Sequence, residues 1–330
     1  MILRHMPALS QEPFRSWFYE HWGRENCVIS ARTRHAEYPM YRQRLSIKAA
    51  WGGSESYFVD GRRIAVDDET FLILNDDRTY ASQLLSSTPV TSFSIFFRPG
   101  MAQEVARTHA LPTELLMEKP RGVRSDSVEF PEQLRAHDRL ITPVLRFIHH
   151  QVEAGVSDED WLEEQLYSLL RRMLTVRGSD LEAMQSIPAL RAGTRRELFR
   201  RMGLCVNFIN TYYTRPIGLA QIAAAAHFSP YHCLRVFKAV YGLTPFSYLN
   251  RRRVRAAVHL LETSHLPIDE VAARVGFECR ATLFRHMRRT RGAAPRAIRA
   301  AAAVKASPER RSRPQMRGPN DGRARRSSRT

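Results

Sequence analysis

Short runs that alternate between apolar and polar residues occupy the chain from about residue 45 to residue 97. Each run has the length of a β-strand, and turn-forming residues separate it from the next. Asp60-Gly61 lies between two alternating runs and predicts a tight hairpin, because glycine accepts the positive φ of a type I′ turn. Strands at such even spacing predict a small barrel or sandwich. The six expected strands are residues 45–50, 56–60, 62–66, 71–75, 80–85 and 90–97.

Two amphipathic helices are predicted after the strands. Apolar residues recur at helical spacing from Leu134 to Ile148, and again from Leu162 to Met173. The second stripe consists of Leu162, Leu166, Leu169, Leu170 and Met173. Such a pair of helices either covers the strands or pairs with a second subunit, and one face can serve both purposes.

Two segments show no sustained pattern. Residues 177–193 contain Gly178, Pro188 and Gly193 and are predicted to be a linker. Residues 301–330 are expected to form a disordered basic tail. From Ser307 onward they mix Ser, Pro, Gly and Arg and offer too little apolar surface to order themselves. The linker divides the chain into an N-terminal domain of residues 1–176 and a C-terminal domain of residues 194–300.

The C-terminal domain contains one pattern twice, at residues 218–238 and 267–289. Each copy predicts a short helix, a tight turn and a second helix rich in arginine, which is the pattern of a helix-turn-helix unit. Phe277 matches Phe228 at an offset of 49 positions. In the first copy Ser229 is a suitable N-cap, and Pro230 occupies the first helical position, where its missing N–H costs nothing.

One long helix is expected to join the two units. Thr244-Pro245 begins it and Thr263 ends it. At ~1.5 Å per residue it is about 30 Å long. This length is close to the ~34 Å between successive major-groove faces on one side of B-DNA. The two second helices are therefore predicted to enter consecutive major grooves.

Residues left outside the apolar stripes of the second helices are candidate DNA contacts. Leu234 and Phe284 have two interpretations, since they can touch a thymine methyl group or be partly buried. Arg251, Arg252, Arg288 and Arg289 are interpreted as phosphate contacts or solvated charges. The candidates are Tyr231, His232, Leu234, Arg235 and Lys238 in the first unit, and Arg280, Ala281, Phe284, Arg285 and Arg288 in the second.

The distribution of charge supports a nucleic-acid partner. The formal net charge is +18, yet residues 1–193 carry −3. Residues 194–300 hold 19 Lys/Arg against 5 Asp/Glu. Such asymmetry suggests nucleic acid or an anionic membrane. A membrane-bound helix needs a free apolar stripe, whereas these stripes are used in packing, so DNA is favoured.

Targeting and redox signals point to a cytoplasmic protein. The first residues are charged and interrupted by Pro7, so no signal peptide is predicted. No apolar run approaches the ~18 residues of a membrane span. Four cysteines without CxxC spacing indicate neither a disulfide framework nor a zinc site.

Residues 194–300 resemble the DNA-binding domain of the AraC/XylS family of bacterial transcription regulators. The match depends on residues 219–223, Ser229, residues 235–238, residues 242–245, Arg253, Ala257, residues 260–261, residues 275–277, Arg285, Gly292 and Pro295. The resemblance implies a transcription factor that binds double-stranded promoter DNA, acts as an activator and contacts RNA polymerase. It adds Thr282 to the candidate DNA contacts.

The N-terminal half is more weakly similar to the cupin-type barrel that precedes this domain in many family members. The similar stretches are residues 71–77 and 92–100. The likeness implies an α+β, cupin-like domain that binds a small-molecule effector and forms a homodimer. Trp51, Tyr57 and Tyr80 are candidate effector contacts, with an ordinary core role as the alternative.

The sequence argues against two enzymatic alternatives. A metal-dependent cupin enzyme needs about three converging His or carboxylate ligands, but no histidine occurs in residues 36–108. A DNA-repair methyltransferase fused to the DNA-binding domain needs an activated acceptor cysteine, and Cys27 lies in no such motif. We therefore predict no catalytic residue, no metal and no cofactor.

Overall fold

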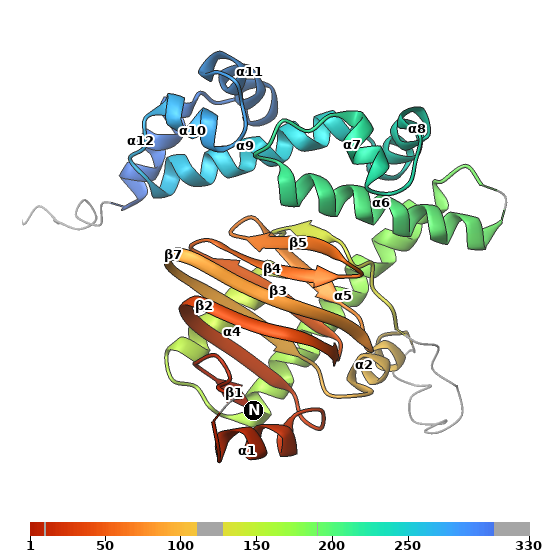
Figure 1. Cartoon of the computed structure of the whole chain (residues 1–330), viewed down its shortest axis with the longest axis vertical. Helices are drawn as coiled ribbons and strands as arrows, with labels where there is room; N and C mark the ends of the chain where they lie inside the picture. The colour runs from red at the N-terminus through yellow and green to blue at the C-terminus, as the bar shows by residue number, and fades with distance from the viewer. Residues whose placement is uncertain (10, 111–127, 190, 307–330) are drawn as a thin grey trace, which may run out of the picture.

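The computed structural model describes residues 1–9, 11–110, 128–189 and 191–306. It consists of a mixed β-sheet domain followed by a domain made of helices (Figure 1). The helical domain lies as a layer along one end of the sheet, above β4 and β5 in the view of Figure 1. This arrangement confirms the predicted α+β organisation and the helical character of the C-terminal half.

The sheet has the strand order β1-β2-β7-β3-β6-β8, and β4 pairs with both β5 and β7. Only β1 and β2 pair in parallel among the described strands. No pairing between the described strands links β1 to β8, so the predicted closed barrel is not confirmed. The strands are β1 (Ile2–Leu3), β2 (Cys27–Gln43), β3 (Ser46–Trp51), β4 (Ser54–Val59), β5 (Arg62–Asp67), β6 (Thr70–Leu74), β7 (Arg78–Phe96) and β8 (Leu134–Ala136).

The hairpin predicted at Asp60-Gly61 is confirmed. Asp60 has φ 49° and Gly61 has φ 72°, and the flanking Val59 and Arg62 are paired. Both central residues thus have the positive φ of a type I′ turn.

The turn predicted at residues 86–89 is wrong, because β7 runs through this segment as one strand of 19 residues. These residues fall in an irregularity of the β2–β7 pairing, between the pairs Thr33–Val90 and His35–Leu85. Strand β3 reaches only Thr91 of β7, and β4 pairs with it only at residues 80–83. Pro89 is therefore tolerated where the second edge of β7 has no partner.

Two helices cover one face of the sheet, as Figure 1 shows. They are α4 (Thr142–Glu153) and α5 (Glu159–Gln185). The stripe from Leu162 to Met173 is 0–1% exposed and packs in one cluster with strand residues such as Ile47 and Phe93. The covering interpretation of this stripe is thus correct, and the same side chains are not available to a second subunit.

The structure corrects the start of the first predicted helix. Leu134 belongs to β8, where it pairs with Leu72, and α4 begins only at Thr142. The carboxylate of Asp138 accepts hydrogen bonds from the N–H groups of Leu140 and Ile141. It also accepts from the N–H of Thr142 at 3.3 Å, so Asp138 satisfies the first N–H group of α4 and the two that precede it.

The predicted linker is also shorter than residues 177–193, because α5 continues through Gly178 to Gln185. A glycine inside a helix costs about 1 kcal/mol relative to alanine. Tertiary contacts offset that cost: Arg135 forms an ion pair with Asp180, and Met184 packs against the core of the next domain. Residues 186–191 then connect α5 to the helical domain.

Seven helices form the C-terminal domain, and no described helix is long and apolar enough to cross a membrane. The last helix extends to Ala306, so the predicted disordered tail from residue 301 is wrong for its first six residues. Its remainder, residues 307–330, lies outside the described residues. The helices are α6 (Ala192–Tyr212), α7 (Leu219–Ala224), α8 (Pro230–Tyr241), α9 (Pro245–Thr263), α10 (Ile268–Arg274), α11 (Arg280–Arg291) and α12 (Pro295–Ala306). The short helices α1 (Phe14–His21) and α2 (Met101–Ala110) belong to the N-terminal domain.

Candidate nucleic-acid interface

The first helix-turn-helix unit consists of α7 and α8. The Ser229 hydroxyl accepts a hydrogen bond from the N–H of His232, and Pro230 follows at the first helical position. This confirms the predicted cap. Cys233, Val236 and Phe237 point into a core shared with α6 and are at most 1% exposed. The opposite side of α8 is therefore the one that faces outward.

The second unit consists of α10 and α11 and repeats this arrangement around its own core. Leu283 and Met287 are buried in this core. Gly276 follows α10 with φ 86°, and a Cβ there would lie 2.8 Å from the carbonyl oxygens of Tyr213 and Thr214. Cys279 caps α11 without a side-chain hydrogen bond to the backbone, unlike Ser229 in the first unit.

Helices α8 and α11 lie at the two halves of the long helix α9, both on the side away from the sheet (Figure 1). Helix α9 runs from Pro245 to Thr263, with Thr244 as its N-cap, so its predicted bounds are confirmed. Its 19 residues correspond to about 28 Å of helix. Helix α9 contacts both α8 and α11 and thus joins the two candidate DNA-reading helices.

The candidate DNA contacts fall into two groups by exposure. Seven are exposed: Tyr231, Arg235, Lys238, Arg280, Ala281, Arg285 and Arg288. Four are half-buried: His232, Leu234, Thr282 and Phe284. Tyr231 is 75% exposed, so its ring is free to contact a partner. All eleven lie on α8 or α11.

The exposed cations are largely free of acidic neighbours. Within the described part of the chain, no salt bridge involves Arg235, Lys238 or Arg288. Arg285 donates to the hydroxyl of Thr282 at 3.4 Å. Arg280 lies 3.6 Å from Asp269, and both side chains are exposed. An exposed pair of this kind contributes about 0–1 kcal/mol, so DNA can replace the carboxylate.

Each unit also holds one half-buried histidine against the phenylalanine of its turn. The ring of His232 lies 5.0 Å from that of Phe228, and His286 stacks on Phe277 at 5.5 Å. Burial, followed by nearby arginines, lowers the pKa of both histidines. Both imidazoles are therefore neutral near pH 7, and each offers one hydrogen-bond donor and one acceptor.

Arg252 is not a DNA contact, so its interpretation as a phosphate contact or a solvated charge is wrong. Its side chain is 0% exposed and forms an ion pair with Asp67 of β5. Its guanidinium lies 3.9 Å over the ring of Tyr213. Arg251, one residue earlier, is exposed and remains a candidate.

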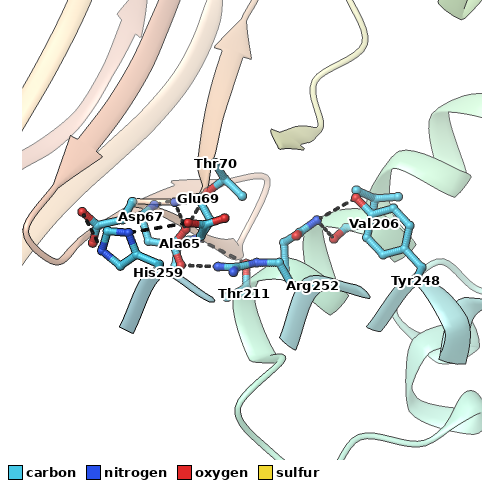
Figure 2. Close-up of polar contacts among 11 residues, drawn as sticks. Ala65, Asp67, Glu69, Thr70, Val206, Thr211, Tyr248, Arg252 and His259 are labelled. Carbon is cyan, nitrogen blue, oxygen red and sulfur yellow. Dashed lines mark hydrogen bonds and ion pairs between the residues drawn. The ribbon is translucent and has the colours of Figure 1, made fainter. Parts of the chain in front are cut away.

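Figure 2 shows the contacts that surround this ion pair between the two domains. The N–H of Ala65 donates to the Thr211 hydroxyl of α6 at 3.2 Å. His259 of α9 lies 3.7 Å from the carboxylate of Glu69. The end of β5 and the turn that follows are thus attached to both α6 and α9.

The structure places two of the three candidate effector residues at one cavity. Tyr57 and Tyr80 line a cavity in the N-terminal domain, together with Lys48 and Glu55. Trp51 does not line it and packs against His149, with ring centroids 4.6 Å apart. Sequence reasoning missed Lys48 and Glu55. A charged residue inside an apolar strand run was the signal that could have found them, because burial of a charge costs free energy unless a partner compensates it.

The described residues contain no group of three or more His, Cys, Asp or Glu side chains arranged to hold a metal ion. Cys27 is fully buried, and burial raises the pKa of its thiol to about 12. A thiol in that state is poorly suited to act as a nucleophile.

Comparison with known proteins agrees with the geometry of the C-terminal domain. Residues 222–301 match the family model described as "Helix-turn-helix domain". The chain is 28% identical over 141 residues to the probable transcriptional regulator LumQ of Photobacterium leiognathi, covering 40% of this chain and 57% of LumQ. It is 34% identical over 73 residues to the bifunctional transcriptional activator/DNA repair enzyme AdaA of Bacillus subtilis, covering 22% of this chain and 35% of AdaA.

Among solved structures, the DNA-binding domain of AdpA in complex with a target DNA is similar. The identity is 33%, the match covers 32% of this chain and 96% of that domain, and the TM-score is 0.31. The C-terminal region is therefore a helix-turn-helix DNA-binding domain of the AraC type. The chain spans only about one third to just over half of the length of the curated relatives named above.

Proposed function

We propose that this protein is a promoter-binding transcription activator in which α8 and α11 read consecutive major grooves and a small molecule bound in the N-terminal domain controls DNA binding. The observation that carries the proposal is the pair of exposed basic helices at the two halves of α9. Seven of the eleven candidate contacts on these helices are exposed.

The candidate residues divide into base readers and phosphate contacts. Arg235 and Arg285 occupy equivalent exposed places in the two units, and an arginine can donate two hydrogen bonds to one guanine. Arg288 lies one turn further along α11, where we assign it to a phosphate. Leu234 and Phe284 are half-buried, which leaves one edge of each side chain to contact a thymine methyl group.

Control by a small molecule is supported by the contacts between the domains. Strand β4 contributes Glu55 and Tyr57 to the cavity, and its neighbour β5 contacts α6 and α9. A change in the cavity therefore reaches the DNA-binding domain through two adjacent strands. The homodimer and the contact with RNA polymerase remain predictions.

The methyltransferase alternative has little support in the N-terminal domain. AdaA is named as a bifunctional enzyme, but its match covers only 22% of this chain. A buried Cys27 with a raised pKa lacks the thiolate character that methyl acceptance needs.

The proposal is tested by selecting binding sites for the full-length protein from random duplex DNA and footprinting the selected site. We expect protection of two major-groove segments about 10 base pairs apart. Tyr231→Ala and Ala281→Arg should each change protection in one segment only. A footprint confined to one turn of DNA contradicts the two-groove assignment, and a failure to select any sequence contradicts sequence-specific binding.

A further inference from the structure

The cavity of the N-terminal domain lies on the face of the sheet opposite α4 and α5 and has a volume of about 270 Å³. The alternation along the strands explains its position, since Ile47 and Ala49 pack under α4 and α5 while Lys48 between them faces the other way. Side chains of β3, β4 and β7 form one wall. The N-terminal segment forms another, with Met6, Leu9, Phe18 and Trp22.

The centre of this cavity is a lysine without a counter-ion. Lys48 is 2% exposed, and its amine lies 3.5 Å over the ring of Phe96 and within 6 Å of the rings of Tyr57 and Tyr80. Within the described residues, no carboxylate lies within salt-bridge distance of it. Removing an ammonium group from water costs several kcal/mol unless a negative charge compensates it.

Two further donors line the same cavity. The hydroxyls of Tyr57 and Tyr80 are buried and make no hydrogen bond of ordinary geometry among the described residues, although Glu55 and Ser94 interact with the first and Ser46 with the second. Buried polar groups without partners are rare in folded proteins, and each one calls for an explanation such as an unoccupied ligand site. Three unsatisfied donor groups around one space favour an occupant that accepts several hydrogen bonds and carries negative charge.

Glu55 is the acidic group nearest to this set, and it does not fill that role. One of its oxygens accepts a hydrogen bond from the Ser92 hydroxyl at 2.6 Å. Burial raises the pKa of Glu55, although Ser92 and Lys48 oppose the shift. Its carboxyl group is thus hydrogen-bonded to Ser92 and forms no ion pair with Lys48 among the described residues.

The size and lining of the cavity restrict the rest of the occupant. An apolar cavity of about 150 Å³ holds one benzene molecule. The present volume of about 270 Å³ therefore holds a ring with a short side chain, about ten non-hydrogen atoms. Aromatic walls favour a ring. Those nearest the amine belong to Tyr57, Tyr80 and Phe96.

We propose that the cavity binds a small aromatic carboxylic acid, whose carboxylate accepts from Lys48, Tyr57 and Tyr80 and whose ring lies against Phe18 and Trp22. The proposal rests on the proposed control of DNA binding by a small molecule and specifies its chemical class. Lys48 provides charge selectivity, and the two tyrosines provide orientation.

The same strands connect this occupant to the DNA-binding domain. Tyr57 pairs with Ile64 and Ser56 pairs with Ala65, so the cavity wall and the contact with α6 are adjacent across one strand pair. Glu55 pairs with Val66, next to Asp67, which binds Arg252 of α9. We expect the bound acid to alter the position of β5 and with it the affinity for DNA.

The test uses three compounds that share a phenylpropyl group and differ in the head group: 3-phenylpropionate, 3-phenylpropanol and 3-phenylpropylamine. Their binding to the full-length protein is measured by isothermal titration calorimetry. We expect one site per chain for the acid and at least tenfold weaker binding of the alcohol and the amine. Equal binding of the acid and the alcohol overturns the assigned class.

Substitutions of the lining residues test whether the acid binds in this cavity. Lys48→Met should weaken binding of the acid at least tenfold without changing the binding of the alcohol, and Tyr80→Phe should weaken it severalfold while filling the same space. Arg32→Met, at an exposed position on β2, is the matched control and should change nothing. If Lys48→Met and Tyr80→Phe both fold and bind the acid as the wild type does, the site assignment is wrong.

DNA affinity measured with and without the acid separates this proposal from the proposed function. If the protein selects no DNA sequence, the regulator assignment fails whatever the cavity binds. If the acid binds through Lys48 and the DNA affinity stays the same, the binding site stands and control through β5 fails. A change of DNA affinity in the wild type that is lost in Lys48→Met supports both.

Discussion

Arg252 of α9 and Asp67 of β5 form an ion pair that joins the two domains, with the arginine side chain fully buried. The guanidinium of Arg252 also stacks on the ring of Tyr213. Its Nε and Nη1 atoms have no hydrogen-bond partner among the described residues. Asp67 is therefore the ion-pair partner of this buried charge, and Glu69 is a further acidic neighbour.

Removal of the carboxylate should weaken this joint strongly. Asp67→Asn leaves a buried charge without a counter-ion, a change that costs about 3–5 kcal/mol in comparable buried pairs. We expect the unfolding of the full chain, followed by calorimetry, to shift to lower temperature or to separate into two transitions. Limited proteolysis between the domains should also become faster.

A second substitution distinguishes loss of charge balance from loss of packing. Arg252→Met in the Asp67→Asn background removes the unpaired charge and should restore most of the lost stability. Arg251→Ala, at the exposed neighbouring position, is the control and should change stability by less than about 0.5 kcal/mol. No recovery in the double variant contradicts the electrostatic explanation.

Base-reading and phosphate-binding arginines should respond differently to substitution. Arg235→Ala and Arg285→Ala should each reduce discrimination between the selected site and a mismatched site by about 1–3 kcal/mol. Arg288→Ala should weaken binding to all sequences alike and lower the slope of log K against log salt by about one. Fluorescence anisotropy at several salt concentrations measures both quantities. Equal losses on matched and mismatched DNA for Arg235→Ala reassign that residue to the phosphate backbone.

The helical domain could be predicted from the sequence because its signals are local. Ser229 and Thr244 cap helix starts with their side chains, and each helix begins where it was expected. The buried and exposed sides of α8 and α11 follow from the spacing of apolar residues. The candidate DNA contacts therefore lie on the second helix of each unit, as predicted, and their contact with DNA stays a prediction.

The sheet and the joint between the domains depend on contacts that are distant in sequence. Strand β2 was missed and β7 was divided at Pro89, because the bulges in their pairing interrupt the alternation of side chains. Arg252 follows another arginine on a basic helix, and nothing in that pattern indicates a partner 185 positions away. The cavity could not be predicted for the same reason, because Lys48 and Tyr80, which line it, belong to different strands that are distant in sequence.

The buried lysine should make the stability of the protein depend on pH. Burial lowers the pKa of Lys48 to about 7, whereas an unfolded chain has a lysine pKa of about 10.4. Between these values the unfolded chain holds one more proton, so this residue's contribution to the unfolding free energy rises with pH. The wild type is thus penalised most below about pH 7.

Lys48→Met should accordingly be more stable than the wild type, with an advantage that is largest near pH 6 and shrinks toward about pH 9. Loss of the positive neighbour also raises the pKa of Glu55 further, which acts in the same direction. Cys27, Tyr57 and Tyr80 face position 48 in both proteins, so their effect is common to the two. Urea unfolding at the two pH values measures the difference. A difference that does not change with pH contradicts the assignment.

The two helix-turn-helix units differ at one equivalent turn position, which is His227 in the first and Gly276 in the second. His227 has φ 56° and Gly276 has φ 86°. Gly276→Ala combines the cost of a left-handed backbone, about 1–2 kcal/mol, with a Cβ placed 2.8 Å from two carbonyl oxygens. Gly242→Ala is the matched control, because its φ is 68° and nothing lies within 4 Å of the added Cβ.

We expect Gly242→Ala to lower the unfolding free energy by about 1 kcal/mol and Gly276→Ala by at least about 2 kcal/mol. The extra loss arises where the turn meets Tyr213 and Thr214, so it should separate the second unit from the end of α6. Footprints of Gly276→Ala should then lose protection in the segment read by α11 and keep that read by α8. Equal destabilisation by the two substitutions, with both segments still protected, shows that the close approach of Gly276 to α6 does not position the second unit.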